Sequence, residues 1–99
     1  MKLFISQPMR DKTDDEIKEE RKRIIETVKK IFPTEKVEVI DSFFEGAPHD
    51  ATPLWFLGES IKLLGQADFV YFAKGWEKYR GCRLEHQCAE EYGIKYVIE

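Results

Sequence analysis

Four short apolar segments alternate with three longer amphipathic segments along this chain, and this alternation constrains its fold more than any other feature. The apolar segments cover residues 2–6, 37–40, 68–72 and 95–98. No two of them are joined by a tight-turn signal, so β-hairpins are not expected. A strand and helix order without hairpins predicts a parallel sheet with helices on both faces.

Capping signals mark the starts of the intervening helices. Thr13 and Glu16 have the spacing of a capping box, and the helix that follows is predicted to end at Pro33. Apolar residues recur along it at helical spacing, namely Ile17, Ile24, Ile25, Val28 and Ile31. Thr52 and Pro53 open a second helix that runs to about residue 66. The third helix is predicted over residues 81–92, with Gly93 at its end.

These elements predict one three-layer α/β domain over residues 1–99 with a four-stranded parallel sheet. Its length of 99 residues and its 42% hydrophobic content fit one small globular domain. The expected strand order is 2-1-3-4. We expect the first and third helices on the face opposite the second.

Charge and residue pattern argue against several classes of partner. A net charge of −3 gives no electrostatic reason to expect a nucleic-acid polymer. No apolar run approaches a membrane span and no signal-peptide core follows Met1, so a cytoplasmic location is expected. Cys82 and Cys88 lie about 240° apart around one predicted helix, which favours reduced thiols. No metal site is expected, because no further Cys or His has ligand spacing.

Glu85 is a charged residue on a helix face that should pack against the sheet. In the predicted third helix it shares one arc with Gly81, Leu84, Cys88, Ala89 and Tyr92. A carboxylate there is costly unless it is paired, hydrogen-bonded or open to a cleft. Open α/β sheets bind ligands beside helix first turns at the carboxyl ends of their strands. The alternative is that the Glu85 head reaches solvent or pairs with Arg80.

The loop after the first strand is a second candidate binding region. Ser6, Gln7, Met9 and Arg10 bring a hydroxyl, backbone N–H groups and a guanidinium near a helix start, which suits an anion. The loop lacks the glycines of a phosphate-binding fingerprint. The alternative for Arg10 is that it binds no anion and forms an ion pair with Asp14 at the surface.

Aromatic residues in two loops add possible walls to such a site. Trp76, in the loop before the third helix, could stack on a planar base. The loop over residues 41–50 carries Phe43 and Phe44, and loops of this length often lie over a site. The alternatives are that Trp76 packs at an edge and that the two phenylalanines plug the edge of the core.

Four segments together carry a family resemblance. They are Phe4-Ile5-Ser6-Gln7-Pro8-Met9-Arg10, Ala67-Asp68-Phe69-Val70, Gly75-Trp76 and Arg80-Gly81-Cys82-Arg83-Leu84-Glu85. They resemble the nucleoside 2-deoxyribosyltransferase superfamily, and the chain is most similar to its short bacterial and phage members of unassigned activity. The resemblance spans nearly the whole chain and implies a flavodoxin- or Rossmann-like fold. It also implies cleavage or transfer of the N-glycosidic bond of deoxynucleosides or their 5′-monophosphates.

The resemblance also implies roles for individual residues. Glu85 matches the carboxylate that attacks the anomeric carbon, and Asp68 matches the acid that handles the leaving base. The implied substrate-binding residues are Ser6, Gln7, Met9, Arg10, Trp76, Arg80 and Gly81. The chemistry needs no cofactor, because a carboxylate and a proton donor lower the same barrier. The alternatives are a non-catalytic nucleotide-binding module and an interaction protein in which Glu85 is structural.

The second helix predicts self-association. Its residues Leu54, Leu57, Gly58, Ile61, Leu64 and Gly65 form one arc that can cover the sheet. Phe56 and Leu63 fall on the other side, with Trp55 at the flank. A helix that is apolar on two faces needs a second partner, so we expect a homodimer. The alternative is that the preceding loop covers Phe56 within one chain.

Overall fold

Four parallel strands form one sheet in the order β2-β1-β3-β4. The computed structural model describes residues 1–44 and 46–99. The strands are β1 (Lys2–Ser6), β2 (Glu38–Val39), β3 (Phe69–Phe72) and β4 (Lys95–Ile98). The predicted α/β class, parallel sheet and strand order are confirmed, and they agree with a flavodoxin- or Rossmann-like fold.

Three α-helices connect these strands, and their ends follow the capping residues of the sequence. They are α1 (Asp14–Ile31), α2 (Pro53–Leu64) and α3 (Arg80–Glu91), with a short 3-10 helix η1 (Trp76–Lys78) before α3. Thr13 and Glu16 form both bonds of the capping box at the start of α1. The Thr52 hydroxyl accepts a hydrogen bond from the Trp55 N–H at the start of α2.

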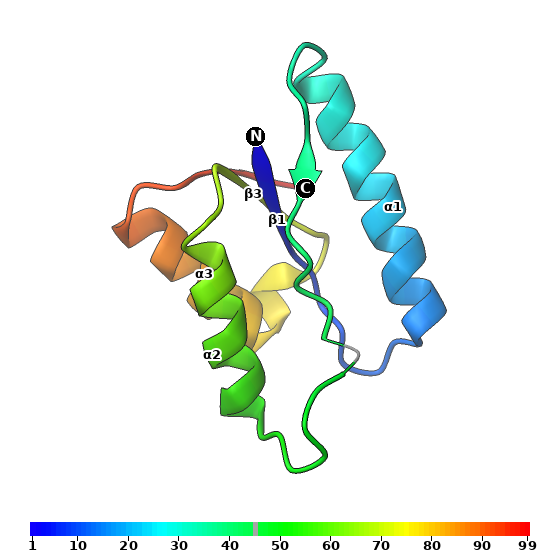
Figure 1. Cartoon of the computed structure of the whole chain (residues 1–99), viewed down its shortest axis with the longest axis vertical. Coiled ribbons are helices and arrows are strands. Elements are labelled where there is room, and N and C mark those ends of the chain that lie inside the picture. The colour runs from blue at the N-terminus through cyan, green and yellow to red at the C-terminus, as the bar shows by residue number, and fades with distance from the viewer. Residues whose placement is uncertain (45) are drawn as a thin grey trace.

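Helix α1 covers one face of the sheet, and α2 and α3 cover the other (Figure 1). The prediction that α1 and α3 would share a face is wrong. From β1 the chain crosses to β2 at one edge, then crosses back past β1 to β3, and continues in that direction to β4. Right-handed crossovers change face only when the direction of crossing changes, so α2 and α3 follow each other on the same side.

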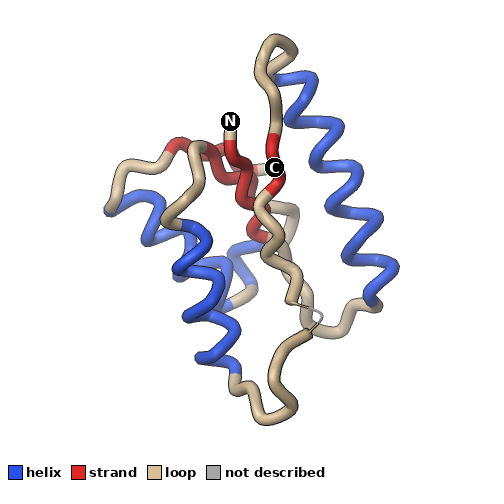
Figure 2. The backbone as a smooth tube through the Cα atoms, viewed as in Figure 1, coloured by secondary structure: helices blue, strands red, loops and turns tan. Residues whose placement is uncertain are grey.

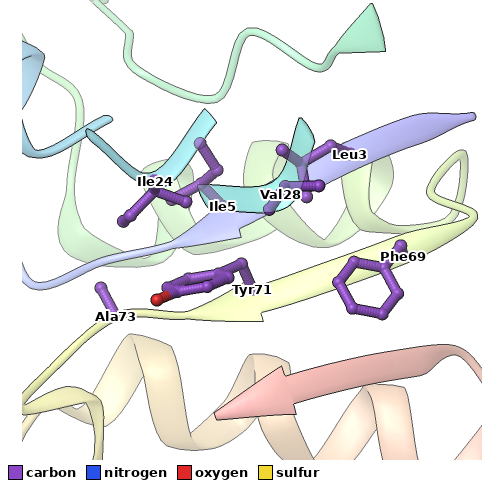
Figure 3. Packing of buried hydrophobic residues seen from close by; sticks show 7 residues of the cluster. All are labelled: Leu3, Ile5, Ile24, Val28, Phe69, Tyr71 and Ala73. Carbon is purple, nitrogen blue, oxygen red and sulfur yellow. The ribbon is translucent and has the colours of Figure 1, made fainter. Parts of the chain in front are cut away.

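The core on the α1 side is formed by aliphatic residues of α1 packed on two central strands (Figure 3). Ile24 and Val28 project from α1 onto Leu3 and Ile5 of β1. The buried members of this cluster are Leu3, Ile5, Ile24, Val28, Phe69, Tyr71 and Ala73. Burial of these α1 side chains removes apolar area from water, and this is the main contribution to the stability of the packing between α1 and the sheet.

The core on the other side is built from the alternate residues of the same strands. Its buried members are Phe4, Ile40, Leu64, Val70, Phe72 and Ala89. The stripe of α3 that faces this core contains Cys82, Glu85 and Ala89, with His86 half-buried against Phe72. Strands buried on both faces in this way read as continuous apolar runs, as the sequence shows.

Two predicted helix faces differ from the structure. Leu84 in α3 is 38% exposed and Tyr92, just after α3, is 82% exposed, whereas His86 packs among aromatic side chains. In α2, Leu54 is 76% exposed, whereas Leu63 packs against the sheet core instead of pointing outward. Along the described part of the chain, none of the helices combines the length and apolar composition that crossing a membrane requires.

Candidate functional site

Glu85 lies in the second turn of α3, at the edge where the strands end. Ser6 pairs with Phe72 in the sheet register, so the carboxyl ends of β1 and β3 lie side by side. From this edge the Ser6 hydroxyl donates a hydrogen bond of 2.6 Å to Glu85 Oε1. The Glu85 side chain is 8% exposed and has no ion-pair partner among the described residues. The expected alternative, a pair with Arg80, does not form.

The surroundings of Glu85 favour its protonated form. Burial raises the pKa of this carboxyl from 4.5 to about 7, and hydrogen bonds from the Ser6 and Ser60 hydroxyls partly oppose the effect. Both the acid and the carboxylate are therefore populated near neutral pH. Groups with such pKa values are concentrated at functional sites.

A cavity of about 200 Å³ opens beside the Glu85 carboxyl. Its aromatic walls come from Phe44 in the loop after β2, Phe56 in α2 and Tyr79 before α3. The described part of the loop between β2 and α2 extends beyond the carboxyl end of β1 (Figure 2). Aromatic walls around a carboxyl suit a planar, partly polar ligand.

A second and larger cavity meets the first at Glu85. This groove lies between α2 and α3, has a volume of about 630 Å³ and is lined by apolar side chains that include Leu54, Leu57 and Leu84. Arg80 lines the groove, and Gly81 lines both cavities. Glu85 therefore borders both cavities.

The structure brings only some of the predicted site residues together. Gln7, Met9 and Gly81 line the smaller cavity with Glu85, and Ser6 donates to its carboxylate. Among the described residues, the exposed Arg10 is not part of either cavity wall. The prediction for Trp76 is also not met, because its ring stacks on His86 with centroids 4.5 Å apart.

Asp68 is separated from Glu85 by the length of a strand. It precedes β3, where Phe69 pairs with Leu3, whereas Glu85 contacts the Ser6 end of β1. Asp68 Oδ2 accepts a hydrogen bond of 2.8 Å from the Lys2 N–H at the amino edge of the sheet. At about 3.3 Å per residue, the two edges are roughly 13 Å apart. The expectation that Asp68 and Glu85 share a cleft is wrong.

Gln7 lies at the cavity, but its amide is used inside the protein. Its Nε2 donates to the Ile17 carbonyl at 3.3 Å and to Glu20 Oε1 at 2.9 Å. Its Oε1 accepts from Arg21 Nη1 at 3.0 Å. Both amide protons are therefore committed, and Gln7 forms a fixed wall instead of a hydrogen-bond donor to a ligand.

Three small polar residues of the site were not predicted. Ser60 lies four residues after Phe56 and four before Leu64, so it interrupts an inward stripe of α2 much as Glu85 interrupts that of α3. Ser42 follows the second strand as Ser6 ends the first, which places both at the same edge. Cys82 has a pKa raised by burial to about 11, so it is a neutral thiol at neutral pH.

The described residues around the two cavities form no metal-binding cluster. Within residues 1–44 and 46–99, no three His, Cys, Asp or Glu side chains are placed to hold a metal ion together. The chemistry available at the site is that of Glu85, its serine partners and the aromatic walls. Comparison of the chain with protein-family models, curated proteins and solved structures finds no match.

Proposed function

We propose that this protein cleaves or transfers the N-glycosidic bond of a deoxynucleoside or deoxynucleoside 5′-monophosphate, with Glu85 as the nucleophile. The observation that carries the proposal is a buried carboxyl at a cavity wall that interacts with the Ser6 and Ser60 hydroxyls and has no ion-pair partner among the described residues. A structural glutamate at this depth would be expected to have a cation beside it.

The reaction has two balanced steps. In the first, the Glu85 carboxylate attacks the anomeric carbon, a C–O bond forms, and the C–N bond breaks with its electron pair on the base. Asp68 lies at the other edge of the sheet, so the departing base takes its proton from water. In the second step, water or another base attacks the same carbon and releases Glu85. Positive charge that develops on the sugar is stabilised by the carboxylate.

The pKa of Glu85 adds a test of this mechanism. The nucleophile must be ionised, and burial places the pKa of Glu85 at about 7. We therefore expect the rate of base release to increase with pH up to about 7 and to level off above it. A rate that falls over this range would indicate that the protonated form of Glu85 is the reactive one.

The decisive experiment is incubation with deoxynucleosides and their 5′-monophosphates, followed by chromatography for released base. A second free base in the same mixture distinguishes transfer from hydrolysis. Glu85→Gln keeps the shape of the side chain but not the nucleophile, so it should abolish release. Glu91→Gln, on the exposed face of the same helix, is the matched control. Release by Glu85→Gln at the parental rate would reject the covalent role.

A non-catalytic nucleotide-binding module is the second candidate, and the position of Asp68 favours it. With Asp68 at the opposite edge, no second carboxylate faces Glu85 across either cavity in the described chain. A binder needs the aromatic walls and the cavity but not a paired acid. If none of the tested nucleosides or nucleotides releases base but calorimetry detects binding of one, nucleotide binding replaces bond cleavage as the proposed function.

A further inference from the structure

Arg21 is a buried cation behind the wall of the smaller cavity. It projects from α1, is 8% exposed, and has no ion-pair partner within the described parts of the chain. Burial without an ion pair is costly for a guanidinium unless its N–H groups are hydrogen-bonded. Arg21 follows Ile17 by four residues and precedes Ile24 by three, so it occupies the buried stripe of its helix.

The Arg21 guanidinium joins the two loops that form that wall. Its Nη1 donates to Gln7 Oε1 at 3.0 Å and to Ser42 Oγ at 3.3 Å. Its Nη2 donates to the Ile40 carbonyl at 3.2 Å. Gln7 and Ser42 both line the cavity beside Glu85. One side chain of α1 thus holds the loop after β1 and the loop after β2 in fixed relative positions.

This arrangement also determines what Ser42 can offer to a ligand. A hydroxyl has one proton to donate, and a guanidinium can only donate, so the Arg21 bond uses a lone pair of Ser42 and leaves its proton available. None of the described residues accepts that proton, and Ser42 is 4% exposed. Ser42 is part of the cavity wall, two residues before Phe44, which lines the same cavity.

We propose that Ser42 determines specificity by donating a hydrogen bond to an acceptor atom of the base, and that Arg21 is the positioning residue that fixes Ser42 as a donor. The acceptor is a ring nitrogen or a carbonyl oxygen of a base stacked against Phe44. Gln7 cannot substitute for Ser42, because Arg21 and α1 occupy its amide. The role of Ser42 rests on the proposed function of Glu85, whereas the bracing by Arg21 does not.

Two substitutions at Ser42 isolate the hydroxyl. Ser42→Thr keeps the hydroxyl. Ser42→Val has the shape of the threonine variant but carries a methyl group where threonine has its hydroxyl. We expect a KM about tenfold higher for Ser42→Val than for Ser42→Thr, with nearly equal kcat, because valine lacks both the hydrogen bond to the bound base and the acceptor for Arg21. Equal KM values for the two variants would overturn the role of Ser42.

Substitutions of Arg21 test the positioning role. Arg21→Met should raise KM at least as much as Ser42→Val, and Arg21→Lys, which retains the charge and some donors, should restore part of the loss. Arg23→Met is the control, because Arg23 projects outward from the same helix and pairs with Glu99. If Arg21→Met does not fold, the comparison of Arg21→Lys with the parent replaces it. A lower kcat at unchanged KM would overturn the assignment.

Amide hydrogen exchange supplies a measurement that does not depend on turnover. Arg21→Met, or Arg21→Lys if the former is unfolded, should increase exchange at residues 40–44 at least tenfold, and Arg23→Met should not. Unchanged exchange would overturn the bracing by Arg21. If the parent releases no base but these amides exchange faster in the Arg21 variant, the proposed function and the role of Ser42 fail while the bracing stands.

Discussion

Burial of the Glu85 carboxyl links the stability of the domain to pH. Its pKa is about 7 in the folded protein and 4.5 when it is freely hydrated. The folded state therefore holds this proton more tightly than the unfolded state between these two values. The contribution of Glu85 to stability is greatest below pH 4.5, decreases as the pH rises towards 7, and is constant above it.

Replacement of Glu85 should remove this dependence. The difference between the two pKa values corresponds to about 3 kcal/mol. We expect Glu85→Gln to be more stable than the parent at pH 8 by up to this amount, and the difference to shrink towards pH 4. Urea denaturation at a series of pH values measures both proteins. Parallel stability curves for the parent and Glu85→Gln would contradict the raised pKa.

Asp68 provides the opposite case, a carboxylate with a structural contact far from the cavity. Asp68→Ala removes the acceptor for the Lys2 N–H, so we expect a loss of about 1 kcal/mol in the free energy of unfolding. Because the residue lies at the amino edge of the sheet, base release should be unchanged. A folded Asp68→Ala protein that releases no base would show that Asp68 acts in the reaction.

Helical periodicity identified the charged residue in the apolar stripe of α3, but it did not predict which side of that helix packs against the sheet. A charge that interrupts an apolar stripe singles out Glu85 in α3, and Arg21 in α1 carries the same signal. The rotation of α3 depends on contacts that no single helix encodes. His86 packs against Phe72, Trp76 and Tyr96, which belong to three other segments. The periodicity of α3 alone could not reveal this preference.

The orientation of α2 can be tested with two leucines. Leu64 is 1% exposed and packs against the sheet, whereas Leu54 is 76% exposed. We expect Leu64→Ala to lower the free energy of unfolding by 2–5 kcal/mol, on the order of other buried leucine truncations. Leu54→Ala should change it by less than about 0.5 kcal/mol. Similar losses for the two variants, measured by urea denaturation, would contradict this orientation.

The strand order of the whole molecule followed from the sequence, whereas the layout of its site did not follow completely. Alternating elements and short connections leave few topologies open, so 2-1-3-4 could be predicted. The error over Asp68 has a simple physical cause. Asp68 opens the predicted strand over residues 68–72, so in a parallel sheet it lies at the amino edge. Glu85 contacts Ser6 at the carboxyl edge, so the two residues could not share a cleft once the strands are parallel.

The exposed apolar groove between α2 and α3 supports the prediction of a homodimer. The proposed contact is this groove and not the Phe56 and Leu63 face that the sequence suggested. Phe56 is 38% exposed and packs on Phe44 and Trp55, so the preceding loop covers it only in part. Leu54 and Leu84 line the open groove together with Phe56. Burial of this groove against a second copy would remove apolar area from water.

Light scattering after size exclusion tests the dimer. We expect twice the monomer mass of 11.7 kDa at tens of micromolar protein. Leu54→Glu with Leu84→Glu should give a folded monomer, because each charge would have to be buried in the contact. Lys62→Glu, on an exposed position of α2, is the control for added negative charge. A parent protein that elutes as a monomer refutes the prediction.

The hydrogen bond between Ser6 and Glu85 joins residues that are 79 positions apart. A ribosome therefore completes β1 long before it makes the helix that carries the other half of the site. During synthesis the inner strand β1 lacks its neighbour β3, and the Ser6 hydroxyl has no carboxyl to bind. Contacts of such long sequence separation slow folding and form late. We expect ligand binding to be gained only in the final folding phase, so a nascent chain that ends before α3 would be inert towards its ligand.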